Sequence, residues 1–380
     1  MFFKDIVGQE GIKDRLIKSV QQGRIPHAQL FVGPMGTGKL PLAIAYAQYI
    51  MCENRGETDS CGVCHSCKKI SKLVHPDLHF VYPAKSSEKK DADAENDYDD
   101  TISAWREQIL SNPYFSEADW YAQVGLANKQ GVISTAKASE VIRKLMLKSF
   151  ESDYKVMIIW LPERMNVQSS NKLLKLIEEP PEKTVFLLVS ENPNAIIKTI
   201  LSRTQQIMIP PVSRESIALA LTDRLSVTPE KAHDISRLAN GSWYNAINLL
   251  NAKPGDYFQH YSTLMRLCYK RDFKGLIDWS QEVAGEFERE ELKQFLAYSL
   301  KLTRESMVAR VGLSNISYIV GEESGFVQNF SPYISMNAIQ EVSDEFSSAY
   351  EHISQNGNPQ IVLSHMAVGM ARFISQKPED

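Results

Sequence analysis

Residues 33–40 read GPMGTGKL, and this stretch decides how the first part of the chain should fold. Gly33, Gly38 and Lys39 fit the phosphate-loop pattern G-x-x-x-x-G-K-[ST] at every fixed position except the last. In that pattern, backbone amides and the lysine hold the phosphates, and the final hydroxyl helps to hold Mg²⁺. Leu40 occupies the final position and has no oxygen. The stretch therefore predicts the fold of a nucleotide-binding domain whose metal site is damaged.

The residues around this loop have the order that a phosphate loop requires, which is strand, glycine loop and helix. AQLFVG precedes the loop as a short strand, and LPLAIAYAQYIMC follows as a helix. KVMIIWL (155–161) and TVFLLVS (184–190) are continuous apolar runs, which are typical of buried parallel strands. Helical segments separate these strands, so we predict a parallel sheet with helices on both faces. The candidate nucleotide-binding residues are Gly33, Gly36, Thr37, Gly38 and Lys39.

The end of the strand KVMIIWL tests whether the chain can hydrolyse ATP. In an active enzyme this strand ends in two acids, one for Mg²⁺ and one for the attacking water. Here the strand ends in Trp160 and Leu161, and the next acid, Glu163, should point elsewhere because side chains alternate along a strand. Two supports for Mg²⁺ are therefore missing, and we expect no intrinsic ATPase activity.

Four of the five cysteines form the pattern C-x8-C-x2-C-x2-C at Cys52, Cys61, Cys64 and Cys67. Four thiolates can close a tetrahedral Zn²⁺ site, which is structural because no coordination position stays open. His65 lies inside the pattern and is a less favoured alternative ligand. We therefore predict a structural zinc module at residues 52–67.

Composition excludes several classes of protein. The 42 basic and 46 acidic residues give a net charge of −4, which argues against a dominant nucleic-acid surface. The N-terminus has no long apolar run, and no segment approaches the length of a membrane span. We expect a cytoplasmic protein, in which clustered cysteines bind metal rather than form disulfides.

The remaining sequence suggests an insertion and a helical second half. Residues 84–131 begin with a charged stretch, AKSSEKKDADAENDYDD, which predicts a mobile loop, and continue with an aromatic stretch that should pack somewhere. We interpret the whole segment as an insertion on the surface of the first domain. After Pro211 the strands stop, and every later periodic segment is helical.

Arg203, in the segment LSRTQ, has two open interpretations. It could present its guanidinium to the phosphate of a neighbouring subunit, as an arginine finger does. One arginine before a strand is, however, far more often a surface charge or a member of a salt bridge.

Several blocks together resemble the clamp-loader branch of the AAA+ proteins, and within it the group of bacterial delta-prime subunits. The blocks are DIVGQE, PHAQLFVGPMGTGK, the four-cysteine module, HPDLHFV, YKVMII, ERMNVQSSNKLLKLIEEPP, LLVSENP, ILSRTQ and NGSWYNAINLL. The resemblance implies an AAA+ domain at 1–211, a small helical lid at 212–253 and an all-helical collar at 254–380. It also implies that Ser202 and Arg203 act in trans on an adjacent subunit.

The implied function is a non-hydrolysing subunit that joins ATPase subunits and a delta subunit in a hetero-pentamer, which loads a sliding clamp on primed DNA. Two alternatives stay open: an ATP-hydrolysing subunit of the gamma/tau type, and a switch that binds nucleotide without turning it over. Zn²⁺ is the expected cofactor, ATP or ADP is left open as a weakly held ligand, and Mg²⁺ is not expected.

Overall fold

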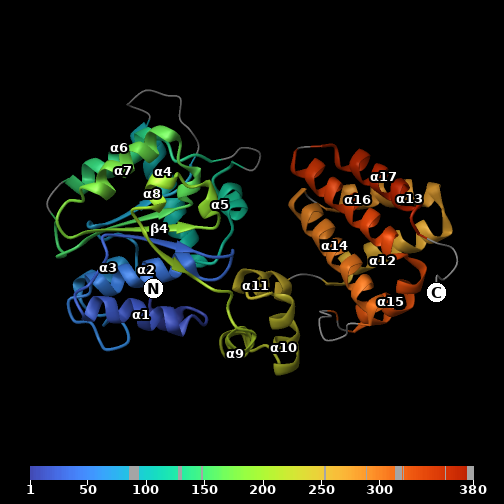
Figure 1. The fold of residues 1–380 in the computed structure, drawn as a ribbon, viewed down its shortest axis with the longest axis horizontal. Helices are drawn as coiled ribbons and strands as arrows, with labels where there is room; N and C mark the ends of the chain where they lie inside the picture. Colours follow the sequence, from blue (N-terminus) through green and yellow to red (C-terminus); the bar gives the residue numbers. More distant parts are fainter. Residues whose placement is uncertain are drawn as a thin grey trace. The chain divides into compact units, whose positions relative to one another are not determined.

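The computed structural model divides the chain into two compact units, residues 1–248 and 249–380 (Figure 1). The structure describes residues 1–84, 94–126, 131–146, 149–251, 254–287, 289–312, 319, 321–355 and 357–374. Each unit has its own hydrophobic core, and each is described by itself.

The first unit contains a five-stranded sheet with the order β2-β3-β4-β1-β5. All neighbouring strands are parallel, which confirms the prediction from the apolar runs. The strands are β1 (Ala28–Val32), β2 (Leu78–Val81), β3 (Lys155–Trp160), β4 (Thr184–Ser190) and β5 (Gln205–Met208). β1 lies between β4 and β5, so the loop that follows β1 lies beside the carboxyl ends of both neighbours.

Helices cover both faces of the sheet because successive strand residues point to opposite sides. Phe31 belongs to the core on one face, with α1 and α2, whereas Leu30 and Val32 belong to the core on the other, with α7. In Figure 1 the sheet lies between α1 and α2 on one side and α6 and α7 on the other. The helices of this part are α1 (Glu10–Gln21), α2 (Lys39–Met51), α3 (His65–Ile70), α4 (Ala94–Ser111), α5 (Glu117–Gln123), α6 (Thr135–Met146), α7 (Val167–Glu178) and α8 (Lys198–Leu201).

The segment that we interpreted as a surface insertion contributes instead to the main core. Trp105 of α4 and Trp120 of α5 are fully buried, and the Trp105 ring stacks on Tyr82 with the ring centroids 4.2 Å apart. Of the charged stretch, Ala84 forms an isolated β-bridge with Val132, residues 85–93 lie outside the described part, and the residues from Ala94 onward are helical. Burial of large aromatic rings stabilises the fold strongly, so the aromatic part of the segment packs in the core although charged residues precede it.

Three further helices follow Pro211, and the last of them runs from the first unit across its boundary at residue 248. They are α9 (Arg214–Leu225), α10 (Pro229–Leu238) and α11 (Trp243–Asn251). Backbone hydrogen bonds connect them to the sheet part, since the Trp243 amide donates to the Gly36 carbonyl at 2.9 Å. The start of α11 therefore lies directly on the glycine loop.

The second unit is helical throughout its described residues, apart from one isolated β-bridge. Its helices are α12 (Pro254–Lys270), α13 (Phe273–Glu286), α14 (Arg289–Val311), α15 (Glu322–Phe330), α16 (Met336–Ser354) and α17 (Pro359–Met370). Their apolar sides form a single core that includes Phe295, Phe346 and Met366. Among the described helices of the chain, none combines the length and the apolar character that crossing a bilayer requires.

Candidate functional site

The glycine loop connects β1 to α2 with the backbone shape that the sequence predicts. Gly36 and Gly38 have φ angles of +77° and +89°, which L side chains rarely adopt. Gly33 needs to be glycine for a different reason, because a Cβ there would lie 2.3 Å from the Ile209 carbonyl oxygen. Thr37 is fully buried and donates its hydroxyl to the Pro34 carbonyl at 2.9 Å.

Lys39 begins α2, and its amine is buried rather than open to solvent. The side chain is 5% exposed, and Nζ donates to the Pro34 carbonyl at 2.6 Å. Nζ also lies 3.5 Å from Oε1 of Glu191, the residue that directly follows β4. Burial lowers the pKa of Lys39 and raises the pKa of Glu191, and the attraction between the two charges opposes both shifts. Lys39 therefore has a carboxylate partner within its own domain, whose side chain is 33% exposed.

The positions that should support Mg²⁺ are occupied by core side chains. Leu40 is 4% exposed and packs in the core between the sheet and α2. Trp160 is also buried, and its ring centroid lies 5.3 Å from that of Trp105. Leu161 is buried with a φ of +56°, and it ends the strand. Glu163 accepts hydrogen bonds from the amides of residues 191 and 192, at 3.0 and 3.2 Å.

The four cysteines come together as the spacing predicts. Their sulfur atoms all lie within 4.8 Å of one another, with Cys52 to Cys61 at 3.5 Å and Cys61 to Cys67 at 4.0 Å. A tetrahedral Zn²⁺ with sulfur ligands at about 2.3 Å places its sulfurs roughly 3.8 Å apart. Backbone amides also donate to the sulfurs, as in the bond from the Cys67 amide to Sγ of Cys64 at 3.4 Å. The donor set therefore fits a closed, structural metal site.

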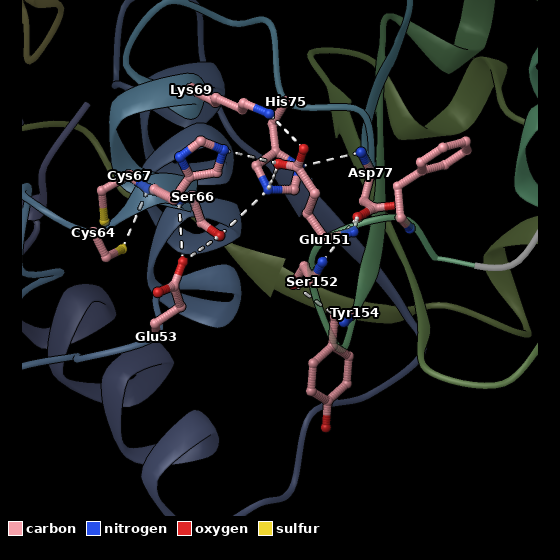
Figure 2. Close-up of polar contacts among 12 residues, drawn as sticks. Glu53, Cys64, Ser66, Cys67, Lys69, His75, Asp77, Glu151, Ser152 and Tyr154 are labelled. Carbon is pink, nitrogen blue, oxygen red and sulfur yellow. Dashed lines mark hydrogen bonds and ion pairs between the residues drawn. The ribbon is translucent and has the colours of Figure 1, made fainter.

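His65, the alternative ligand, points away from the sulfurs. Its side chain is 66% exposed, and Nε2 lies 3.7 Å from Oε2 of Glu151. Glu151 also forms an ion pair with Lys69 of α3 (Figure 2). The metal module is thus tied through its helix to the loop before β3.

Asp77 holds that loop in place from the start of β2. Its carboxylate is buried and accepts hydrogen bonds from the amides of Phe150, Glu151 and Ser152, at 2.8, 2.8 and 2.9 Å (Figure 2). Burial opposes the charge of Asp77, but the three amides outweigh it and lower the pKa. The Asp77 amide in turn donates to Nδ1 of the buried His75. Nothing in the sequence pattern pointed to this network.

Arg203 lies in the turn between α8 and β5, and the structure brings Ser202 beside it. Nη2 of Arg203 is 2.7 Å from Oε1 of Glu178 at the end of α7, and the two side chains are 42% and 39% exposed. Nη1 donates to the Thr199 carbonyl and to the Ser202 hydroxyl, at 3.2 and 3.3 Å. The salt bridge that the sequence left open as an alternative is therefore present in the isolated chain.

Arg203 and the glycine loop lie at opposite ends of the parallel strands, Arg203 at the amino ends and the loop at the carboxyl ends. Gln205 pairs with Gln29, so Arg203 lies two residues before that register and Gly33 four residues after it. At roughly 3.3 Å per residue, the two positions are about 20 Å apart along the strands. Arg203 therefore cannot reach the loop of its own domain.

Comparison with known proteins identifies a family for the first unit. A family profile described as "DNA polymerase III, delta subunit" matches residues 8–213. The chain belongs to this family. The matched range contains the glycine loop, the four cysteines and Arg203, and it ends where α9 begins.

The relatives of this chain are DNA polymerase III subunits named delta', tau and gamma. DNA polymerase III subunit delta' of Bacillus subtilis is 29% identical over 61% of this chain, and DNA polymerase III subunit tau of the same organism is 23% identical over 100% of it. Subunit tau of Escherichia coli is 28% identical over 65% of this chain. The chain spans 56%, 63% and 32% of the lengths of these three relatives.

Two residues at the loop of this family member were missed by sequence reasoning. Glu191 lies in the block LLVSENP, and its position directly after a buried strand was the available signal. Tyr114 lies in the presumed insertion, and its hydroxyl oxygen accepts a hydrogen bond from the Val7 amide at 3.1 Å. No local pattern connects Val7 with Tyr114, because the two residues are 107 positions apart.

Proposed function

We propose that this chain is a non-hydrolysing subunit of the delta-prime type in a bacterial clamp loader. It would assemble with ATPase subunits of the tau or gamma type and with a delta subunit, as part of a hetero-pentamer. The complex would open a sliding clamp and load it on primed DNA. Membership of the DNA polymerase III delta-subunit family supports this assignment, as do relatives named delta' and tau.

One observation carries the proposal, which is the buried end of β3. Trp160 and Leu161 are 4% and 2% exposed where a hydrolysing enzyme needs two acids facing the nucleotide. Leu40 removes the remaining protein ligand for Mg²⁺. Without the metal, the charge that develops on the transferred phosphate is not neutralised, so hydrolysis is not supported.

The position of Arg203 supports a role in trans. The residue is half-exposed and lies at the amino ends of the strands, away from the glycine loop. One ion pair and two hydrogen bonds hold its guanidinium. An exposed ion pair of this kind is weak, so a phosphate of a neighbouring subunit could replace Glu178 as the partner. Ser202 would help to hold the guanidinium in place through its hydroxyl.

The other parts of the chain have supporting roles in this proposal. Helices α9–α11 would form the lid, and the second unit would form the collar that holds the ring together. The four cysteines would hold one structural Zn²⁺, which supplies folding free energy rather than chemistry.

The competing function is an ATP-hydrolysing subunit, because several relatives are named tau or gamma. ATP turnover distinguishes the two. We expect the pure chain to show no steady hydrolysis, and we expect it to stimulate turnover when it is mixed with its tau-type partner. Hydrolysis by the isolated chain that is lost in Lys39→Ala would refute the assignment.

A further inference from the structure

We infer that the phosphate loop is permanently closed by this chain's own residues, with Glu191 in place of a nucleotide phosphate and two segments covering the glycines. The loop then takes no nucleotide. It packs instead against three parts of the first unit, which are Glu191 after β4, the segment between α4 and α5, and the start of α11. This inference is independent of the proposed function, because a subunit that does not hydrolyse ATP could still hold ATP or ADP.

The first support is the partner of Lys39. In a working loop this amine stays available for the phosphates of the nucleotide. Here it is 95% shielded from solvent, bonded to the Pro34 carbonyl and 3.5 Å from the Glu191 carboxylate. A nucleotide phosphate would bring a second anion next to Glu191, in a site where like charges repel strongly. The Glu191 carboxylate, whose side chain is 33% exposed, is therefore already the anion that Lys39 faces.

The second support is a cover over Gly38, formed by the segment between α4 and α5. Tyr114 is 7% exposed, and a Cβ added at Gly38 would lie 3.2 Å from its hydroxyl oxygen. The same oxygen accepts the Val7 hydrogen bond, so a backbone amide beside the loop is already satisfied. Tyr114 thus fills the space next to the loop and fixes the N-terminal segment to it.

The third support is a cover over Gly36, formed by the start of α11. A Cβ added at Gly36 would lie 2.0 Å from the Ser242 hydroxyl and 2.8 Å from Cβ of Tyr244. The Trp243 amide also binds the Gly36 carbonyl, at 2.9 Å. The loop is therefore in close contact with the start of α11 at Gly36.

The two covers are bonded to each other across the loop. The Tyr244 hydroxyl donates to Oγ of Ser116 at 3.4 Å, and the rings of Tyr114 and Trp243 meet edge to face with centroids 6.4 Å apart. Opening the loop would therefore separate both segments at once. The residues present do not fit a bound nucleotide. Their contacts hold parts of the first unit together instead.

Nucleotide binding to the full chain is the direct test. A ligand that binds only the folded state raises its melting temperature. We expect neither MgATP nor ADP at about 1 mM to shift the melting temperature relative to NaCl of equal ionic strength. A saturable shift that disappears in Lys39→Ala would overturn the inference.

The role of Glu191 is tested by substitution, with Glu179→Gln as the matched control on the exposed end of α7. Glu191→Gln leaves a buried cation without its anion, so we expect the melting temperature to fall by roughly 5 °C or more. The double variant Lys39→Met/Glu191→Gln removes that cation and should recover part of the loss. Equal melting of Glu191→Gln and Glu179→Gln would overturn the inference.

The cover is tested by Tyr114→Phe, which removes only the hydroxyl. Hydrogen exchange at the Val7 amide should accelerate by about tenfold or more, because one hydrogen bond is lost. Tyr121→Phe, in the adjacent helix α5 and bonded to Glu117 and Gly131, is the control and should leave Val7 exchange unchanged. Unchanged exchange at Val7 in Tyr114→Phe would show that Tyr114 does not hold the N-terminal segment on the loop, and it would overturn this part of the inference.

Discussion

Replacing Arg203 by alanine distinguishes a trans-acting residue from an ordinary surface ion pair. Within the chain, the substitution removes one pair whose members are 42% and 39% exposed, which stabilises by at most about 1 kcal/mol. For a unit of this size the melting temperature should fall by only about 2–4 °C. In the assembled complex, loss of an arginine finger lowers turnover by about 10³–10⁵, which corresponds to about 4–7 kcal/mol of transition-state stabilisation. The two interpretations therefore differ by several kcal/mol in what the assay measures.

The informative control is Glu178→Gln, because it breaks the same ion pair and leaves the guanidinium in place. If Arg203 acts only through Glu178, both variants should have the same activity and the same melting temperature. If Arg203 acts in trans, Glu178→Gln should keep or increase DNA-stimulated ATP turnover and clamp loading, while Arg203→Ala loses them. The assay is reconstitution of the complex with each variant, with incorporation verified by gel filtration. Full turnover by a complex that contains Arg203→Ala would refute the trans role.

Three further predictions concern stability. Metal analysis should find one Zn²⁺ per chain, and its removal by a chelator should lower the melting temperature of the first unit, whereas metal-free protein of unchanged stability would exclude a structural zinc. Gly36→Ala should destabilise by about 1–3 kcal/mol more than Gly125→Ala, because both positions have positive φ but only Gly36 has a neighbour at 2.0 Å, the Ser242 hydroxyl; equal losses would show that the contact is relieved without cost. Burial, assisted by the charge of Lys144, lowers the pKa of His79 to about 4, so the unfolded chain binds more protons below pH 6.5. Stability should therefore fall by at most about 3 kcal/mol between pH 6.5 and 4, and His79→Gln should flatten that part of the profile in denaturant titrations.

The sequence predicted the parts of the fold that depend on local pattern. β3 and β4 are continuous apolar runs, and every residue in both strands is buried. The glycine loop and the four cysteines were predictable for a related reason, since each needs particular residue types at fixed spacing within a short segment. For Arg203 the segment LSRTQ left two interpretations open, and only the resemblance favoured a role in trans, because a single arginine carries no spacing signal.

The parts that were missed depend on contacts between distant segments. The charged stretch before Trp105 suggested a surface loop, and nothing local indicated that its ring would stack on Tyr82. The pair of Lys39 with Glu191 exists because β4 lies beside β1 in the sheet, and a strand order of this kind is not contained in either segment. Sequence reasoning identified the missing metal ligands, but it could not identify Glu191 as the partner of Lys39.

Under the proposed function, the two ends of the parallel strands have different roles. At the carboxyl ends of the strands, where the glycine loop lies, β3 ends without acids and Glu191 pairs with Lys39. The amino ends, about 20 Å away, keep an arginine in a weak and reversible ion pair. A loop that never exchanges ligand cannot drive opening and closing of its own domain, since a ligand shifts an equilibrium only through differential binding. The first unit would then present Arg203 from a domain of constant shape, and the movements of the complex would arise in the neighbouring subunits that bind ATP.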